Sequence, residues 1–411
     1  MQAASAAAPP TPPIRPAMTG WLFGAAVLIG HFFLLVNPSI PAGFGFVLMD
    51  QPFLDSHAIL AAGDALRAGL DPWKPHALDA LGRPHCYSSW WLFSAELGLT
   101  RTDNIWLGSL WACAFILTAL AVLQPRSTRR MLVAAAVLFS PPVLLGVNRA
   151  NNDLPIFALL ASGAILLGTA GRGAIWLFGG IVALATGLKF YPLAAIAGFL
   201  GIRPRSRALV AMLLTALLAA AALTQAEIGR ALGTAPAPIG TLTFGHLTLL
   251  RWTDWSPNTS RAAASVMIAG FAWLCVRRGW APRFSAGAES TTSGIAFLTG
   301  ASVLTACFLL TGNYAYRLVF IVMVVPHLAS ANSGRGGRIT LALLLALLWV
   351  DGLFCLLSAP VAGNLDAGAR RIVENAWLLV SQPVAWLAVA LLAAGLMEAG
   401  RSLLVNDGGR R

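Results

Sequence analysis

The chain has few charged residues. Only 11% of its 411 residues are Asp, Glu, Lys or Arg, whereas 57% are hydrophobic. Apolar runs of about 20 residues recur along it, and each is long enough to cross a hydrocarbon core about 30 Å thick. No soluble domain of ordinary size remains between these runs. The sequence therefore predicts an all-α polytopic membrane protein.

Cysteine and histidine are also scarce, and neither is spaced as metal ligands are. Four of the five cysteines fall inside apolar runs, and Cys86 alone falls in a predicted outer loop. This distribution excludes a disulfide framework or a zinc site. The six histidines show no metal-ligand spacing, and no acidic pair has the spacing of a metal-binding motif. We therefore expect no metal and no cofactor.

The basic residues, which give a net charge of +12, indicate topology rather than nucleic-acid binding. They gather in short loops between apolar runs, as cytoplasmic loops do. These loops lie at 125–130, 201–207, 277–283 and 334–338. We expect a disordered cytoplasmic tail (1–18), one multi-pass domain (19–398) in the cell inner membrane, and a basic cytoplasmic tail (399–411). The longer loops, 38–103, 225–261 and 358–376, then face outward.

About twelve membrane crossings or re-entrant helices are expected. The pair at 174–188 and 191–201 is short for full crossings. The segments are 19–37, 104–124, 131–147, 153–169, 174–188, 191–201, 208–224, 262–276, 292–311, 316–331, 339–357 and 377–397.

The first outer loop holds an unusual group of carboxylates: Asp50, Asp55, Asp64 and Asp71. From Asp55 the apolar positions recur at intervals of 4, 3 and 4 residues, through Ile59, Ala62 and Leu66. This period predicts an amphipathic helix lying in the membrane interface, with Asp55 at its start. Asp55 could equally be only the cap of that helix. We expect Asp71 to bond its own backbone in a turn and Asp64 to pair with Arg67.

A second polar cluster, at the outer ends of two spans, holds Asn148, Arg149, Asn151, Asn152 and Asp153. Amides and an arginine fork suit a sugar or a phosphate. The alternative is a tight polar turn in which Asn152 or Asp153 caps the next helix. A turn needs fewer polar groups than this, so we favour a functional role.

Two further clusters fall at the same side. Lys189 lies between two short apolar segments, where it must snorkel, pair or bind an anion, and Pro192 breaks the pattern after it. Asn313, Tyr314 and Arg317 mark the outer start of a later helix, where an arginine runs against the charge bias. The tyrosines there say little by themselves, and His327, further along, is expected to be a satisfied interior residue. Polar groups at membrane depth are costly, which makes all four clusters candidate functional sites.

Several of these motifs resemble glycosyltransferase family 87 and its relatives in the GT-C superfamily. The run from Asp55 to Trp73, with His57 two residues after the aspartate, is similar to that family's first-loop pattern, and GLKFYP, holding Lys189 and Tyr191, is similar to a second motif. NRANNDLPIFALL and NYAYRLVFIVMVVPHL are similar to two more. The resemblance spans roughly residues 19–330. It departs at Trp73, where Tyr is usual, and at Ala315, where an acidic residue is more common.

The resemblance implies a GT-C-like bundle and an enzyme that transfers a sugar, often mannose, from a polyprenyl-phosphate donor to a lipid or envelope-glycan acceptor. Transfer would take place with inversion on the extracytoplasmic face, with Asp55 as general base. A single displacement needs that base and cations for the leaving phosphate, and Lys189 with Arg317 or Arg149 fits this role. Further expected substrate-binding residues are His57, Asn148, Asn152, Asp153, Tyr191, Asn313 and Tyr314. The alternatives are a secondary transporter or lipid-linked-sugar flippase, and an inactive scaffold subunit.

Overall fold

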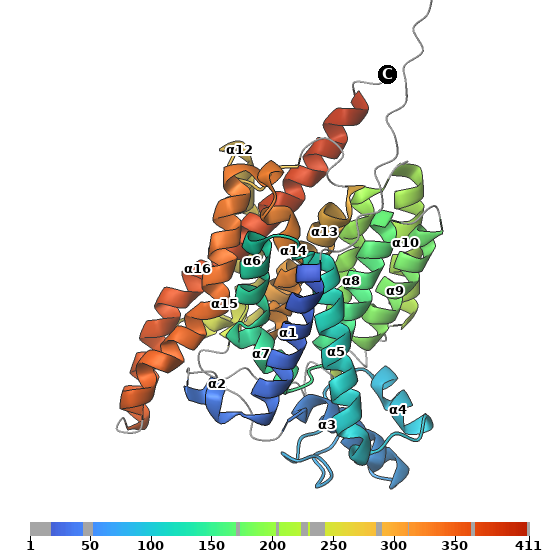
Figure 1. Cartoon of the computed structure of the whole chain (residues 1–411), viewed down its shortest axis with the longest axis vertical. Coiled ribbons are helices and arrows are strands. Elements are labelled where there is room, and N and C mark those ends of the chain that lie inside the picture. The colour runs from blue at the N-terminus through green and yellow to red at the C-terminus, as the bar shows by residue number, and fades with distance from the viewer. Residues whose placement is uncertain are drawn as a thin grey trace, which may run out of the picture.

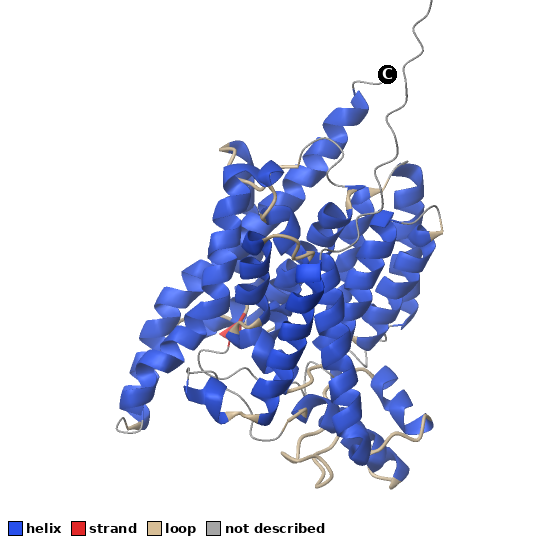
Figure 2. Ribbon diagram, in the orientation of Figure 1, coloured by secondary structure: helices blue, strands red, loops and turns tan. Residues whose placement is uncertain are grey.

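The computed structural model describes residues 18–43, 52–169, 173–202, 205–222, 229–230, 243–284, 290–310, 312–362 and 366–408. Asp50 lies outside these residues, as does much of the predicted outer loop 225–261. The described chain is almost entirely helical, and its one small sheet pairs β1 (Thr243–Phe244) antiparallel with β2 (Asn313–Tyr314) (Figure 2). The prediction of an all-α polytopic membrane protein is confirmed.

Six helical segments are long and apolar enough to cross a membrane: Thr19–Val36, Arg101–Leu123, Pro257–Arg277, Thr292–Leu310, Ala331–Ser358 and Arg371–Arg401. They belong to α1 (Met18–Val36), α5 (Asn104–Leu123), α12 (Pro257–Arg277), α13 (Thr292–Leu310), α15 (Gly334–Ala362) and α16 (Ala367–Gly408). The 3₁₀ turns η2 (Arg101–Asp103) and η8 (Ala331–Ser333) precede α5 and α15. In Figure 1, α1 and α5 run roughly along the long axis of the molecule, and α16 crosses the bundle obliquely.

The remaining predicted crossings are bent or short. α6 (Thr128–Leu138) and α7 (Pro141–Asn148) meet at a bend of 58°, where Pro141 and Pro142 begin the second helix. The other apolar helices have apolar stretches of 10–17 residues, with Arg207–Ala221 as the stretch in α10, which is at or below the lower limit for a full crossing, so the count of twelve stays a prediction. They are α8 (Asp153–Thr169), α9 (Ala174–Leu188), η3 (Tyr191–Gly201), α10 (Arg205–Ala222), and η7 (Ala315–Phe320) with α14 (Ile321–Leu328).

Helix α13 lies at the centre of the bundle. Every residue from 294 to 304 is buried, which requires neighbours on all sides of the helix. Its main neighbours are η3, α14, α8 and α16. Gly300 permits the close approach of α14, because a Cβ there would lie 2.7 Å from the Cβ of Met323. This core holds the ends of α7, α8, α9 and η7 together at one end of the molecule.

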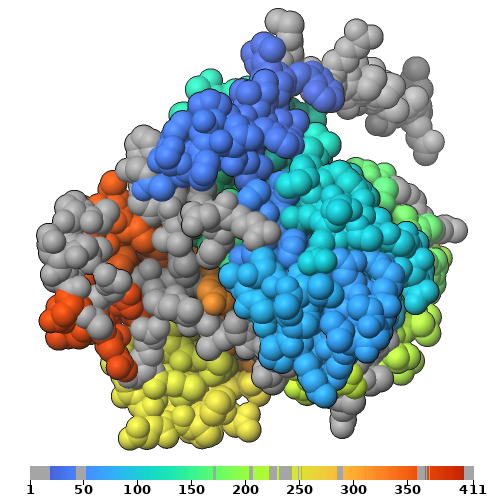
Figure 3. All heavy atoms as spheres, turned by 90° about the horizontal axis from the view of Figure 1, so that it is seen from below, coloured from blue at the N-terminus to red at the C-terminus, as the bar shows by residue number. Residues whose placement is uncertain are grey.

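A lobe of short elements covers that end. It consists of α3 (Leu54–Arg67), η1 (Ser89–Leu92), α4 (Phe93–Glu96) and the turns between them. Figure 1 places the lobe at the base of α5, and Figure 3 shows it spread over part of that face beside α1. The small helix α2 (Ser39–Gly43) follows α1, and η5 (His246–Arg251) precedes α12.

The amphipathic helix predicted from Asp55 exists, and its place in the membrane interface stays a prediction. Helix α3 packs into the lobe against α4, α5 and η1. Ile59 and Ala62 are buried as the period predicted, whereas Leu66 is 44% exposed. The helix is covered because Leu60 and Ala61, outside the predicted face, are also buried, so that protein surrounds most of its circumference.

Candidate active site

Helix α3 is held at its start by the loop between α7 and α8. The backbone N–H of Phe53 donates to the carbonyl of Asn148 at 2.7 Å, and that of Asp55 donates to the carbonyl of Arg149 at 2.9 Å. Phe53 adopts a left-handed backbone conformation with φ of 60°, and its ring packs over Gly108 of α5. These contacts fix Asp55 against the helix bundle, where it is only 1% exposed.

The carboxylate of Asp55 binds an arginine fork. Arg149 donates from Nε to Oδ2 at 2.8 Å and from Nη2 to Oδ1 at 2.6 Å. Asn151 donates to Oδ2 at 2.6 Å, and Nη1 of Arg83 lies 3.6 Å from Oδ1. The expectation that Asp55 only caps its helix is wrong: no side chain caps α3, and this carboxylate faces the cations instead.

Arg83 belongs to a second fork within the lobe. Its Nε and Nη2 each donate to Asp79 at 2.9 Å, and Nη2 also donates to the carbonyl of Leu54. Burial alone would raise the pKa of Asp79, but the bonds from Arg83 hold it below its usual range. Asp79 therefore keeps Arg83 aimed at the start of α3.

Asp153, at the start of α8, collects a second set of partners. Its Oδ1 accepts hydrogen bonds from the ammonium of Lys189 and the hydroxyl of Tyr191. Nε of Arg317 lies 3.7 Å from its Oδ2. Lys189 is 9% exposed, so the alternative that it snorkels to water is wrong. It can reach Asp153 because α9 ends at Leu188 and the chain turns extended before η3.

Asn151 joins the two carboxylates. Its Nδ2 donates to Asp55, and its Oδ1 accepts from the backbone N–H of Asp153 at 2.9 Å. The polar-turn alternative is thus correct in part, although Asn151 serves the helix start, not Asn152 or Asp153. Around this link, among the residues that the structure describes, four cations (Arg83, Arg149, Lys189, Arg317) face three carboxylates (Asp55, Asp79, Asp153), which gives one more positive than negative charge.

All four tyrosines of the chain lie against these cations. The Arg149 guanidinium lies 6.0 and 5.8 Å from the ring centroids of Tyr314 and Tyr316, which stack on each other. The ammonium of Lys189 lies 5.7 Å from the ring centroids of both Tyr87 and Tyr191, and Arg317 lies 5.0 Å from that of Tyr191. Aromatic faces stabilise cations taken out of water. The expectation that the tyrosines say little is therefore wrong.

The remaining residues expected at the site differ in their surroundings. Asn152 is fully buried, and within the described chain neither atom of its amide has a hydrogen-bond partner. Asn148 contributes its carbonyl to Phe53, as above. Asn313 belongs to β2 and donates to the carbonyl of Cys307, which gives it a structural contact. His57 is half-buried, burial lowers its pKa, and no bond from it to Asp55 is present.

Three smaller predictions are confirmed. Asp64 pairs with Arg67 at 2.5 Å and also with Arg101 at 2.7 Å. The carboxylate of Asp71 accepts from the backbone N–H of Trp73. His327 is a satisfied interior residue, because its Nε2 lies 3.1 Å from the carbonyl of Arg283 and its ring stacks on Phe284.

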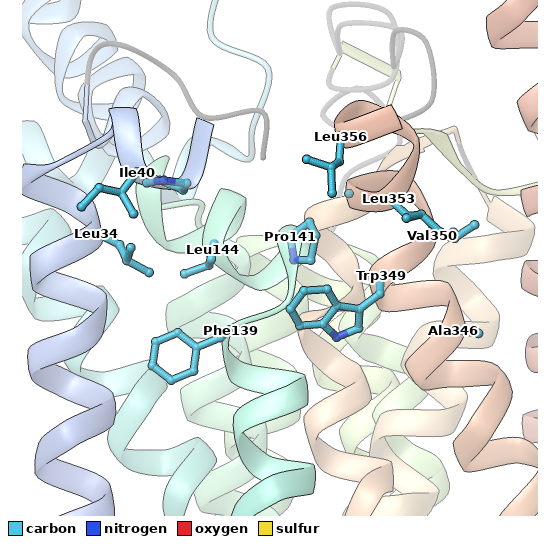
Figure 4. Close-up of a pocket in the computed structure, with 12 residues that line it drawn as sticks. Leu34, Ile40, Phe139, Pro141, Leu144, Ala346, Trp349, Val350, Leu353 and Leu356 are labelled. Carbon is cyan, nitrogen blue, oxygen red and sulfur yellow. The ribbon is translucent and has the colours of Figure 1, made fainter. Parts of the chain in front are cut away.

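An apolar groove of about 780 Å³ lies beside the site, between α1, α7 and α15. Figure 4 shows Leu34 and Ile40 on one side, Trp349 and Leu353 on the other, and Leu144 of α7 between them. Helix α7 continues from Leu144 through one turn to Asn148 and then to Arg149. Leu144 of the groove therefore lies about one helical turn before the segment that carries Arg149, and Leu145 and Val147 between them are buried in the bundle.

Within the described ranges, no three His, Cys, Asp or Glu side chains gather as ligands for one metal ion. No protein-family model matches this chain, and no curated protein is found to be similar to it. Among solved structures, the crystal structure of ArnT from Cupriavidus metallidurans bound to undecaprenyl phosphate shows 12% identity and a TM-score of 0.40. The match covers 94% of this chain and 77% of that one. A likeness this low does not decide the function, which has to be inferred from the site.

Proposed function

We propose that the protein is a membrane glycosyltransferase that uses a polyprenyl-phosphate sugar. It would transfer the sugar, a hexose such as mannose or a pentose, to a lipid or envelope-glycan acceptor at the extracytoplasmic face of the inner membrane. The motif resemblance supplies these substrates. The observation that carries the proposal is the excess of cations around Asp55 and Asp153 at the ends of apolar helices.

The cations suit a phosphate leaving group. Lys189 and Arg317 converge on Asp153, so this carboxylate holds both in place for an arriving anion. Arg149 presents a planar fork that matches phosphate as well as it matches a carboxylate. The tyrosine rings around these side chains allow them to remain charged in a site with little water.

Asp55 is the proposed general base. In the transfer, an acceptor hydroxyl oxygen bonds to the anomeric carbon, the bond from that carbon to the phosphate oxygen breaks, and the hydroxyl proton passes to Asp55. The electron pair leaves with the polyprenyl phosphate, whose charge the cations stabilise. Because Arg149 binds Asp55, a donor phosphate that attracts this arginine would also free the Asp55 carboxylate to accept a proton.

The apolar groove between α1, α7 and α15 supports a lipid-borne donor. A polyprenyl chain needs an apolar surface to lie against, and Leu144, which lines the groove, stands on the same helix as Asn148, the residue before Arg149. Asn152, next to Asp153, has a buried amide without a hydrogen-bond partner among the described residues, which makes it a candidate partner for a sugar hydroxyl.

Reconstitution tests the proposal. The full-length protein in vesicles is supplied with a polyprenyl-phosphate mannose carrying a labelled sugar, together with lipid extract as the source of acceptor. The enzyme is expected to release polyprenyl phosphate and to move the label onto the acceptor. A flippase would move the donor between leaflets with the sugar still attached. A scaffold subunit would do neither, and either of these results would overturn the proposal.

A further inference from the structure

A second cavity, with a polar lining in part, lies at the end of α5 that is far from the lobe. It has a volume of about 560 Å³ and is bordered by the end of α5, the start of α6, the start of α13 and the segment after α14. Helix α5 begins beside Asp64 and Arg101 of the lobe and ends at Leu123, which lines this cavity. The cavity is therefore separated from Asp55 by a full membrane-crossing helix.

Two arginines give the cavity its charge. Arg129 and Arg130 lie in the first turn of α6 and are exposed, and none of the lining residues is acidic. Neither arginine forms an ion pair with a carboxylate of the described chain, whereas Arg83, Arg149 and Arg317 at the opposite end all do. Two positive charges in a concave site have no neutralising protein group among the described residues.

Hydrogen-bond donors surround the same space. Ser127, Thr291 and Ser293 contribute hydroxyls, with one hydrogen bond shared between Thr291 and Ser293, whereas Ser330 donates its proton to the carbonyl of His327. At the helix starts, Ser127 accepts from the backbone N–H of Arg130 in α6, and Thr291 accepts from the backbone N–H of Gly294 in α13. The C-terminal ends of α5 and α14 also border the cavity, so the four helix dipoles largely cancel. The attraction for an anion must therefore come from the two arginines, with the hydroxyls supplying directional bonds.

We propose that this cavity binds the phosphate group of an anionic ligand. Adjacent guanidinium groups and hydroxyl donors are the partners that a phosphate oxygen prefers. The cavity lies where one membrane-crossing helix, α5, ends and another, α13, begins, so a phospholipid headgroup can reach it from the bilayer and a free phosphate compound can reach it from water. The site is independent of the proposed glycosyl transfer.

Retention of arginine in short cytoplasmic loops is the competing explanation, since such residues set topology without binding anything. The chain contains a matched pair for this comparison. Arg277 and Arg278 are adjacent and exposed, lie at the end of α12 and do not line the cavity. If these arginines serve topology alone, replacing either pair should change anion binding by the same amount.

The test titrates the full-length protein in neutral detergent with dioctanoyl phosphatidylglycerol, dioctanoyl phosphatidylcholine and inorganic phosphate, and follows the unfolding temperature. We expect phosphatidylglycerol to raise it. Arg129→Gln/Arg130→Gln should weaken that ligand by roughly tenfold or more, and Arg277→Gln/Arg278→Gln should leave it nearly unchanged. Lys189→Met, at the other end of the molecule, should also leave it unchanged. Stabilisation by phosphatidylglycerol but not by phosphate identifies a lipid headgroup, and stabilisation by both identifies the phosphate group alone.

Two results would overturn the proposal. One is the absence of stabilisation by phosphatidylglycerol and by phosphate. The other is an equal loss of phosphatidylglycerol affinity in the Arg129/Arg130 and Arg277/Arg278 variants, which would indicate that the lipid responds only to diffuse surface charge. If the double glutamine variant does not fold, Arg129→Lys/Arg130→Lys replaces it in the test. This variant keeps both positive charges but loses the planar guanidinium groups. It should bind with an affinity below that of the unaltered protein, and unaltered binding in it would also contradict the proposal.

Discussion

Asn151 holds the Asp55 carboxylate through its amide nitrogen, at 2.6 Å, while its amide oxygen accepts from the backbone of Asp153. One side chain thus sets the spacing between the proposed base and the carboxylate that orders two cations. The two aspartates are far apart in the chain, and Asn151 belongs to the turn that carries both Arg149 and Asp153. Movement of this turn would change both halves of the site together.

Replacement of Asn151 by Ala is expected to slow sugar transfer about tenfold or more, because it removes a hydrogen bond to a charged group and loosens the start of α8. Turnover of reconstituted protein and the unfolding temperature measure the two effects. Asn37, the residue after α1, donates from its amide to the carbonyl of Phe33 within that helix, and Asn37→Ala is the control. Full activity of Asn151→Ala would show that the link is unnecessary.

Replacement of Lys189 by Met should lower both stability and donor affinity. Asp153 would remain buried with one cation fewer, and removal of one partner from a buried ion pair is strongly destabilising. The double variant Lys189→Met/Asp153→Asn should recover stability, because the carboxylate is gone, without recovering donor affinity. Donor binding measured alongside thermal unfolding separates these effects. Recovery of both together would assign Lys189 a structural role alone.

Gly108→Ala should disturb Asp55 without touching it. A Cβ at Gly108 would lie 2.4 Å from the ring of Phe53, which stands two residues before Asp55. We expect lower turnover and a lower unfolding temperature. Gly270→Ala in α12 is the matched control, because nothing lies within 4 Å of its added Cβ. Wild-type activity in Gly108→Ala would show that the lobe accommodates the displaced ring.

The lobe should lose stability in mild acid because of His85. Burial lowers the pKa of this imidazole from 6.5 to about 4, with a further contribution from His76. The unfolded chain therefore binds a proton that the folded lobe excludes, so the stabilisation is complete above about pH 6.5 and is lost as the pH falls toward 4. His85→Gln should flatten the fall in unfolding temperature between pH 7 and 5. If the unfolding temperature of His85→Gln falls with pH as steeply as that of the unaltered protein, His85 is not the group responsible for the loss of stability in acid.

Local chemistry explains what the sequence could predict. The helix from Asp55, the turn at Asp71 and the pair between Asp64 and Arg67 depend on neighbours within four residues, and the structure contains all three. The apolar runs likewise predicted the long helices. The polar clusters of one predicted side meet as expected, since Asp55, Arg149, Asp153, Lys189 and Arg317 form one network.

The parts that could not be predicted depend on contacts between distant segments. Arg83 shares its loop with Arg67, Lys74 and Arg101, and nothing in their spacing indicates which arginine turns inward. Its pairing with Asp79 and its approach to Asp55 become visible only in the folded lobe. The distribution of tyrosine does point to the site. The chain has only four tyrosines, and each falls in or near a polar motif.

The turnover of Asp55→Asn tests the central claim most directly. The amide keeps the shape of the side chain but cannot take up the proton of the acceptor, so release of polyprenyl phosphate in vesicles should fall by roughly 10²–10⁴. Donor binding should remain, because Lys189 and Arg317 are untouched, and Asp50→Asn should cost far less. An Asp55→Asn protein that turns over at the normal rate, or a folded Asp50→Asn protein without activity, would show that Asp55 is not the base.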